Sequence, residues 1–343
     1  MTGQDLTPTV GSADVRRPNR LSDARRWFLR NTQSVGLLPV IALVVIVGNQ
    51  VSDVFLTHNN ITTLLQSSSV LGILVIAETI ILILGRFDLS LESTVAFAPM
   101  LAAWLITSSS QGGEGVLPPA LGVPVILAAG ALIGLINGVA VVKLRLNAFM
   151  MTLGMLIALR GLTYAMTTGA TIANPPNSMV YIGQGHFLGE PIEIFIVIAL
   201  FVIAGVMMRF HRFGRATYAI GGNEEAARAA GLPVDRTVIM AYVIGSVLAA
   251  AAGMVLSGQV NAVTTQQGEG LIFTVFAAAV IGGISLNGGR GALVGAGLGV
   301  LFLGLVTNVM TLGQIPSQVI EAVRGVVIIG ALLINRFTFE VKE

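Results

Sequence analysis

Residues 120–142 read ALGVPVILAAGALIGLINGVAVV, a stretch without a charged side chain, and this stretch decides the fold class. About 20 consecutive apolar residues cross the hydrocarbon core of a bilayer as an α-helix, so the stretch predicts a membrane span. Lys143 and Arg145 follow it directly. Because basic residues in short loops stay on the cytoplasmic side of a membrane, the end at Val142 is predicted to face the cytoplasm.

The composition of the whole chain agrees with a membrane protein. Of its 343 residues, 54% are hydrophobic and only 10% are charged, and the mean hydropathy is +0.85. An average soluble domain has about 25% charged residues, so these values exclude a water-soluble surface. The 41 glycines suit closely packed spans. The absence of cysteine excludes a disulfide framework, a thiolate nucleophile and a cysteine metal site.

Nine further apolar segments predict an all-α bundle of about ten transmembrane helices. They lie at 36–55, 61–84, 89–107, 148–167, 191–208, 237–257, 271–286, 291–311 and 318–335. Polar stretches, most of them rich in glycine or proline, separate them. The predicted organisation is a cytoplasmic tail over 1–35, a transmembrane domain over 36–335 and a second cytoplasmic tail over 336–343.

The basic residues test this count independently. With the N-terminus inside, all but two of the 19 Lys and Arg residues fall in the tails or in inner loops. The exceptions, Arg160 and Arg324, lie within spans. The outer loops carry acidic residues and no bases; these acids are Asp53, Glu114, Glu190 and Glu269. We therefore predict that both ends lie in the cytoplasm. Spans eight and nine are the least clearly divided pair, because few residues separate them.

The longest inner loop, 209–236, has the signals of a short helix. Gly221 and Gly222 are predicted to break the chain, and Asn223 after them is a good N-cap. Acidic residues follow the cap and a basic residue lies near the far end, as the helix dipole favours, before a Gly and a Pro that stop the helix. We predict a helix over 224–230, which is either a solvated connector or a docking element for a cytoplasmic partner.

The same loop carries a family motif. FGRATYAIGGNEEAARAAGL at 213–232 resembles the cytoplasmic coupling loop of the ribose-type permease subunits of bacterial ABC sugar importers. Three other stretches resemble the same family in the same order: GRFDLSLES at 85–93, NAFMMTLGMLIALRGL at 147–162 and GGISLNGGRGALVGAGLG at 282–299. In the first of them Arg86 and Glu92 replace glycine, and Phe87 and Leu91 replace smaller aliphatic residues. These changes add bulk and charge beside Asp88.

The resemblance implies a membrane-spanning permease subunit of an ATP-binding-cassette importer, which translocates a monosaccharide or related polyol across the bacterial inner membrane. The implied partners are cytoplasmic ATP-binding subunits, a second permease copy that is identical or a paralogue, an extracytoplasmic sugar-binding protein and membrane lipid, without nucleic acid. The implied coupling residues are Gly214, Arg215, Tyr218, Gly221, Gly222, Asn223, Glu224, Ala227 and Gly231.

The chain itself lacks the residues for ATP hydrolysis. A P-loop needs a lysine between Gly and Ser or Thr, and neither of the two lysines, Lys143 and Lys342, has that context. We therefore expect no enzyme, no cofactor bound by this chain and no metal site, with ATP used by a separate subunit. The three histidines lie in predicted loops, which argues against a buried Ser-His or metal-dependent catalytic site; they are His58, His186 and His211.

Charged residues inside the membrane need partners, because each costs about 2.5–3.5 kcal/mol at the bilayer centre. Glu321 and Arg324 are three residues apart on one helix and are predicted to pair. Arg160 has no such neighbour, and we hypothesise that it pairs with Asp88. Further charges in or near spans are Glu78 and Glu92.

Seven polar residues are candidates for lining a solute path: Gln66, Asp88, Ser90, Asn147, Thr152, Arg160 and Asn308. For each of them the alternative is an interhelical hydrogen bond or a helix cap. The alternative function is an ion-coupled secondary transporter of a small polar solute, in which Glu78, Asp88 or Glu321 would hold the proton or ion.

Two glycine ladders with four-residue spacing predict close helix packing rather than ligand contact. They are Gly130, Gly134 and Gly138, and Gly291, Gly295 and Gly299. Met150, Met151 and Met155 are likewise assigned to packing. ILGRFDLS at 83–90 is similar to VIGGISLN at 280–287. A single internal repeat does not explain all the similarities of this kind in the chain.

Overall fold

The computed structural model describes residues 32–340, and these are mostly helical. Ten helices overlap the ten predicted spans: α2 (Thr32–Val51), α3 (His58–Ile83), α4 (Ser90–Ile106), α5 (Gly122–Lys143), α6 (Ala148–Thr167), α8 (Ile192–Phe210), α11 (Val234–Val260), α12 (Leu271–Ile281), α13 (Leu293–Leu312) and α14 (Ser317–Glu340). Helices α2 and α14 each extend into a predicted tail. The rest of those tails, 1–31 and 341–343, lies outside the described residues.

Hydropathy and length identify membrane helices among the described residues. Six of them are long and apolar enough to cross a bilayer, namely α3, α5 with the turn before it, α6, α8, α11 and α13. Three shorter apolar helices accompany them, Gly36–Val51 within α2, Ser90–Ile106 and Leu271–Ile281. The prediction of a polytopic helical membrane protein is therefore confirmed.

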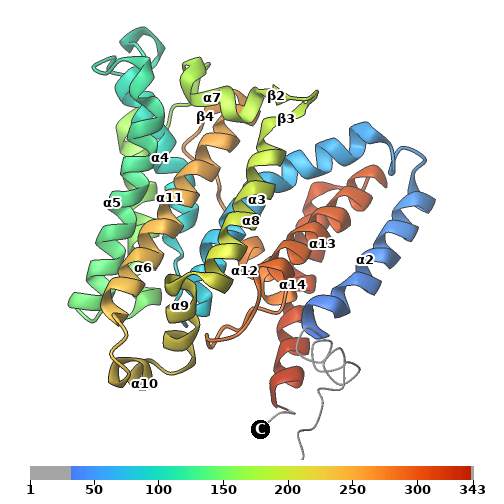
Figure 1. The fold of residues 1–343 in the computed structure, drawn as a ribbon. Helices are drawn as coiled ribbons and strands as arrows, with labels where there is room; N and C mark the ends of the chain where they lie inside the picture. Colours follow the sequence, from blue (N-terminus) through green and yellow to red (C-terminus); the bar gives the residue numbers. More distant parts are fainter. Residues whose placement is uncertain (1–31, 341–343) are drawn as a thin grey trace, which may run out of the picture.

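The short elements lie in the connections. Helix α7 (Asn177–Gln184) and the strands β1 (Ile172–Ala173), β2 (His186–Phe187), β3 (Glu190–Pro191) and β4 (Ala262–Val263) are on one end, and α9 (Arg212–Gly222) and α10 (Glu224–Ala229) are on the other (Figure 1). The strands pair as β1 with β4 and β2 with β3, both antiparallel. Two 3-10 turns, Ser109–Gln111 and Pro119–Leu121, complete the connections. The predicted outer loop 170–191 and inner loop 209–236 thus lie at opposite ends of the bundle.

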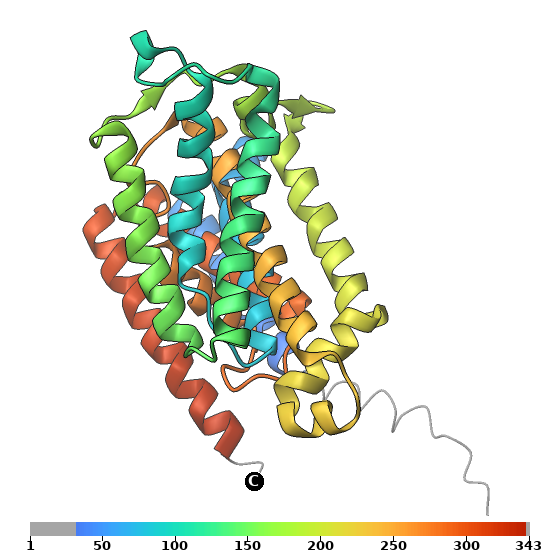
Figure 2. The ribbon, with the colours of Figure 1, turned by 90° about the vertical axis from the view of Figure 1, so that its left-hand side faces the viewer.

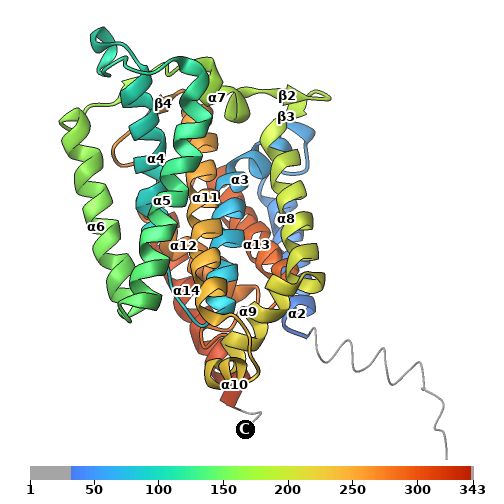
Figure 3. The same cartoon turned by 60° about the vertical axis from the view of Figure 1, so that its left-hand side comes forward.

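Helix α3 forms the centre of the bundle (Figure 3). Its second half, from Gly72 to Ile83, is buried on every face, because α11, α13, α12 and α8 all pack against it. Helix α11 is the other central element and packs against α5, α3 and α4. Helices α2 and α6 lie at the periphery (Figures 1 and 3).

The first glycine ladder explains how α5 and α11 approach each other. A Cβ atom on Gly134 would collide with the Tyr242 carbonyl, and one on Gly130 would lie 2.6 Å from the Ser246 carbonyl oxygen. The absence of side chains at these glycines therefore lets the backbones of α5 and α11 touch, as predicted. In the second ladder a Cβ on Gly299 would collide with Ala278 of α12, but Gly291 precedes α13 and does not belong to a helix face.

Helix α12 is too short to cross the membrane alone. Its 11 residues extend about 16 Å, which is half of the hydrocarbon thickness of about 30 Å. The predicted span 271–286 is therefore too long, because the helix ends at Ile281, before a glycine pair. Non-helical segments at 264–270 and 282–292 flank α12. Spans eight and nine, the least clearly divided pair in the sequence, are therefore well separated as α12 and α13. A third break, 84–89, joins α3 to α4.

Candidate coupling surface and solute pathway

The inner loop 209–236 folds into two helices instead of one. The predicted helix is present as α10, and the Asn223 side chain caps it by accepting a hydrogen bond from the Ala226 N–H at 2.9 Å. The predicted chain break at Gly221 and Gly222 is wrong, because both residues form the last turn of α9. Helix α9 buries the face that includes Phe213 and Ile220, and packs on α8 and α10.

Gly221 lies in the last turn of α9, where its backbone touches the end of α3 and leaves no room for a side chain. A Cβ on Gly221 would collide with the Ile83 carbonyl oxygen, and that oxygen accepts a hydrogen bond from the Gly289 N–H at 2.8 Å. Gly288 adopts a left-handed conformation, with φ of +85°, and its Cα lies next to Gly85. We call Gly85, Gly221, Gly288 and Gly289 the glycine junction. Three of the four sequence motifs meet there. The two similar segments, 83–90 and 280–287, also come together beside this junction.

A chain of ion pairs connects the same loop to the bundle. Arg86 Nη2 lies 2.6 Å from Glu224 Oε2, and Arg228 Nη2 lies 3.0 Å from Glu224 Oε1. Arg228 also reaches Asp235 Oδ1 at 2.8 Å, and Lys143 Nζ reaches Asp235 Oδ2 at 2.9 Å. The chain therefore runs from the break after α3, through α10, to the beginning of α11 and the end of α5.

Two members of this ion-pair chain, Asp235 and Arg228, have shifted pKa values. Asp235 precedes the predicted span at 237–257, and hydrogen bonds from Lys143 and from Arg228 lower the pKa of its carboxyl. Hydrogen bonds to Asp235 and Glu224 raise the pKa of Arg228. The Tyr218 hydroxyl donates to the Gly291 carbonyl oxygen at 2.8 Å, and burial raises its pKa. Helix α9 is thereby tied to the segment 282–292 a second time.

The remaining predicted coupling residues have local roles. Gly214 packs so closely on Met208 that a Cβ atom there would collide with the α8 backbone. Arg215 Nη1 donates to the Phe210 carbonyl oxygen at 2.8 Å, and Ala227 is buried. Gly231 follows α10, where its N–H bonds to the Arg228 carbonyl oxygen at 3.0 Å. The predicted stop after α10 is confirmed.

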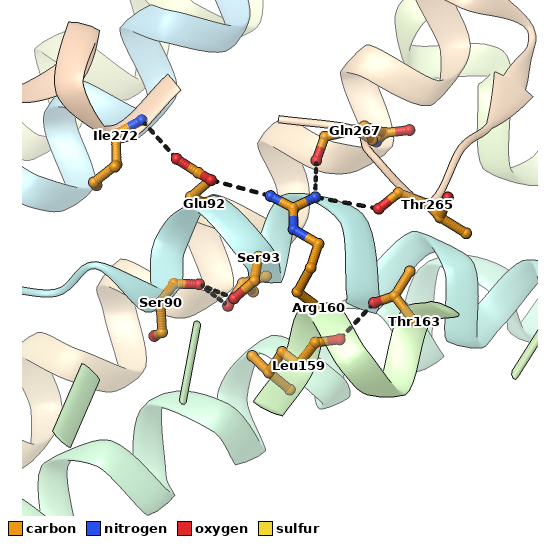
Figure 4. Close-up of polar contacts among 10 residues, drawn as sticks. Ser90, Glu92, Ser93, Leu159, Arg160, Thr163, Thr265, Gln267 and Ile272 are labelled. Carbon is orange, nitrogen blue, oxygen red and sulfur yellow. Dashed lines mark hydrogen bonds and ion pairs between the residues drawn. The ribbon is translucent and has the colours of Figure 1, made fainter. Parts of the chain in front are cut away.

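Arg160 is held by Glu92 and not by Asp88 (Figure 4). Its Nη2 atom lies 3.0 Å from Glu92 Oε1, and Nη1 donates to the carbonyl oxygens of Thr265 and Gln267 at 3.2 and 3.3 Å. The hypothesis of an Asp88–Arg160 pair is wrong. Glu92 lies in the first turn of α4 and also accepts from the Ile272 N–H at 3.3 Å, so it caps α12 while it neutralises Arg160.

Asp88 belongs to a separate buried cluster. Its Oδ1 atom accepts from the backbone N–H and the hydroxyl of Ser90 at 2.9 and 2.6 Å, and the Asn137 amide donates to the Ser90 hydroxyl at 2.8 Å. The Asp88 N–H lies 3.4 Å from Glu78 Oε1. Among the described residues, no hydrogen-bond donor reaches Glu78 Oε2 or Asp88 Oδ2. The two carboxyl groups are fully buried, and no described basic side chain pairs with them.

Thr152 and Asn147 belong to α6. The Thr152 hydroxyl accepts from the Leu89 N–H at 3.2 Å and donates to the Ala148 carbonyl oxygen at 2.9 Å. Asn147 caps α6 by accepting from the Met150 N–H at 3.2 Å. Thr152 therefore lies beside Asp88 and Ser90, near the beginning of α4.

Gln66 and Asn308 lie on other helices. Asn308 exchanges two amide hydrogen bonds with Asn60, at 2.9 and 3.0 Å, and the Gln66 carbonyl oxygen accepts from Gln259 Nε2 at 3.0 Å. The seven candidates therefore do not form one site. Arg324 pairs with Glu321 at 2.8 Å, as predicted.

Gln267 is a structural residue that the sequence did not reveal. Its buried Nε2 atom donates to the carbonyl oxygens of Val95 and Gly253, at 3.0 and 2.8 Å, and to the Ser257 hydroxyl at 3.0 Å. The segment TTQQGEG, 264–270, is predicted as an outer loop because it is polar. Its polarity instead supplies the bonds that fix it between α4, α6 and α11.

The apolar bundle, the non-helical breaks between its helices and the loop attached to those breaks define a multi-pass membrane permease. The chain belongs to the family described as the permease component of the branched-chain amino acid transport system, whose model matches residues 60–332. It is an inner-membrane subunit of an ATP-binding-cassette importer.

Curated relatives support this membership. The chain is 33% identical to the L-arabinose ABC transporter permease protein AraH of Azospirillum brasilense over 311 residues, which cover 91% of this chain and 89% of the relative. It is 33% identical to the ribose import permease protein RbsC of Escherichia coli K12 over 316 residues, 91% and 95% of the two chains. The probable ABC transporter permease protein YphD of the same strain is 34% identical over 311 residues, 91% and 92% of the two chains. No solved structure matches the chain.

Proposed function

We propose that this permease subunit carries a monosaccharide or related polyol across the inner membrane, driven by ATP that separate subunits hydrolyse. The relatives are named for ribose and L-arabinose, which favours a sugar over the amino acids of the family description. The observation that carries the proposal is the glycine junction, because it holds the loop helix α9 directly against the end of the central helix α3.

Helix α10 is the proposed docking element for the ATP-binding subunits. It lies at the extreme end of the bundle, away from α7 and the strands (Figures 1 and 2). Its surface residues Glu225 and Arg228 are exposed, whereas Ala227 is buried against the protein. A subunit that displaced α10 together with α9 would pull on the break after α3 through Arg86 and on 282–292 through Tyr218. These connections support a coupling element over a solvated connector.

The proposed topology has ten spans and both ends in the cytoplasm. It rests on the basic residues in the inner loops and on the separation of 170–191 from 209–236 along the bundle. At the outer end lie α7 and the acids Glu114 and Glu190. We propose that an extracytoplasmic sugar-binding protein docks there.

A second permease copy is proposed to pack on α6. This helix is the least buried of the six long apolar helices and contacts chiefly α4 and α5. Its exposed face includes Gly154 and Gly161, which have open space around them, and Met150 and Ile157. A hollow on this face is lined by Asn147 and by methionines. The second copy would cover this face, and lipid would cover the outer helices.

The cluster around Asp88 is the observation that favours the alternative function. The unpartnered carboxylate oxygens of Glu78 and Asp88 are suited to holding a proton or ion, as in an ion-coupled transporter. Glu321, the third candidate, is paired with Arg324 and is exposed. Transport by this route would follow a proton gradient without an ATPase.

Reconstituted vesicles distinguish the two functions. Vesicles containing this chain, its ATP-binding subunits and its binding protein are expected to take up D-ribose or L-arabinose only with internal ATP. Vesicles containing the chain alone, with a proton gradient imposed, are expected to take up neither sugar. Uptake by the chain alone would overturn the proposed function in favour of the alternative.

A further inference from the structure

The segment 264–270 enters the bundle from the outer end. Gln267 bonds to the Gly253 carbonyl oxygen, two turns before α11 ends at Val260, which is about 10 Å along the helix axis. Gly268 has φ of +79°, and a Cβ there would lie 2.9 Å from Val95 Cγ1, so the turn fits closely against α4. Non-helical backbone at membrane depth is stable only where protein buries it or water reaches it.

One face of this segment is not buried. Gln266 and Glu269 are exposed, and opposite them on α3 Ser67 is exposed as well. These three residues and Gln259 form the polar part of the wall of a cavity of about 280 Å³, and Leu71 and Leu256 contribute to its apolar part. An amide, a hydroxyl and a carboxylate facing lipid would each be costly, which favours water over lipid in this cavity.

The Gln259 side chain is fixed in this wall. Its Nε2 atom donates to the Gln66 carbonyl oxygen at 3.0 Å and to Glu193 Oε1 at 2.9 Å, and Glu193 is fully buried. Because both amide N–H groups are used, the group that Gln259 can offer a ligand is its carbonyl oxygen. The Ser67 hydroxyl donates to the Leu64 carbonyl oxygen at 3.0 Å, which leaves it as an acceptor.

The lining therefore consists largely of hydrogen-bond acceptors beside an apolar wall. Gln259, Ser67 and Glu269 offer oxygen acceptors, and the Gln266 amide can also donate. A polyol has hydroxyl donors on its edges and C–H groups on its faces, and it carries no charge that would need a counter-ion. The cavity is at the small end of the usual range of ligand pockets, about 300–1,000 Å³, which suits a single sugar ring.

We propose that this cavity between α3, α11 and 264–271 binds a neutral polyhydroxylated solute within one protomer, as a stopping point on its way through the membrane. The proposal rests on the proposed function and specifies where the solute is held. It assigns binding to Ser67, Gln259, Gln266 and Glu269, none of which is among the candidates predicted from the sequence.

The natural absence of cysteine makes a direct test simple. Ser67→Cys introduces a single thiol into the cavity of the full chain. The purified variant in lipid nanodiscs is treated with a positively charged, water-soluble methanethiosulfonate reagent, with and without D-ribose or L-arabinose. We expect rapid labelling, slowed about tenfold by a sugar at about ten times its dissociation constant, because about nine-tenths of the sites are then occupied.

Thr63→Cys is the matched control. Thr63 lies one turn earlier on α3, is also exposed and also bonds to a carbonyl of its own helix, at 2.9 Å, but it does not line the cavity. Its labelling is expected to be independent of sugar. Gln266→Cys repeats the measurement on the opposite wall, so that the result does not depend on one substitution being tolerated.

The outcomes separate the site from the function. Absence of labelling at both cavity positions, or labelling that neither sugar slows, would overturn the site. Protection by L-leucine in place of the sugars would overturn the solute class. ATP-dependent sugar uptake by the wild-type transporter together with unprotected thiols refutes the site alone. Protected thiols in a chain that supports no ATP-dependent uptake uphold the site and refute the function.

Discussion

Arg86 is bonded to Glu224 at 2.6 Å, so a residue within the break after the central helix α3 is tied to the first residue of the exposed helix α10. The family resemblance places a glycine at position 86, so this contact is a feature of the present chain beyond the shared motif. It is one of three connections between the coupling loop and the bundle breaks, together with Gly221 and Tyr218.

Breaking this pair should uncouple ATP hydrolysis from transport with little loss of stability. Partly exposed ion pairs contribute about 0.2–1 kcal/mol, so Arg86→Gln should fold normally. If the pair carries about 1 kcal/mol of coupling, the number of sugars transported per ATP should fall about fivefold. Sugar uptake and phosphate release are measured in the same vesicles.

Arg236→Gln is the matched control, since it removes the same charge near the beginning of α11, where Arg236 is exposed and makes no ion pair among the described residues. It should leave the ratio of transport to hydrolysis nearly unchanged. The double swap Arg86→Glu with Glu224→Arg should restore part of the coupling. Equal effects of the two single variants would contradict a specific role for Arg86.

Gly221→Ala should destabilise the glycine junction. Its added methyl would meet the Ile83 carbonyl oxygen, and overpacking of this kind costs about 1–3 kcal/mol. Gly222→Ala is the control, because a Cβ there meets nothing within 4 Å. The thermal unfolding midpoint in detergent should fall for the first variant and stay constant or rise for the second. A constant or raised midpoint in both variants would contradict the contact, because Ala favours a helix over Gly and only a clash reverses that gain.

Removing Arg160 should expose the cost of an unpaired carboxylate at Glu92. The pair is largely buried, with side-chain exposures of 20% and 8%, and breaking such a pair costs about 3–5 kcal/mol. Arg160→Met should therefore lower the unfolding midpoint strongly, and adding Glu92→Gln should recover part of the loss. Adding Asp88→Asn in its place should recover nothing. Recovery through Asp88 would show that the two acids have been assigned to the wrong partners.

The helices could be predicted from the sequence because hydropathy and basic residues act locally. All ten apolar segments contain a helix, and Asn223 caps α10 as its side chain and its position dictate. Glycines Gly130 and Gly134 pack as their spacing indicates, because a four-residue period keeps them on one helix face.

The contacts between segments could not be predicted, since no local pattern encodes them. Asp88 and Glu92 lie one turn apart, and the sequence does not say which of them faces α6. From the sequence alone, Gly221 is taken for a helix breaker. Only the position of Ile83, on another helix, explains why a residue without a side chain is needed there. The polar segment 264–270 resembles an outer loop, although Arg160 and Gln267 hold it inside the bundle.

The two ion pairs that Asp235 makes with Lys143 and Arg228 predict how the stability of the coupling loop changes at low pH. Because both partners lower the pKa of Asp235 in the folded protein, its stabilising effect is fully present above the unfolded value of about 3.9 and is lost as the pH falls below it. Hydrogen exchange in α10 should therefore be constant from neutral pH down to about pH 4, after correction for intrinsic rates, and rise below that. Asp235→Asn should show the faster exchange at neutral pH. Exchange in α7, at the opposite end, serves as the internal control and should not respond to the substitution. If α10 exchanged equally in both proteins at neutral pH, the ion-pair chain would not be what holds it against the bundle.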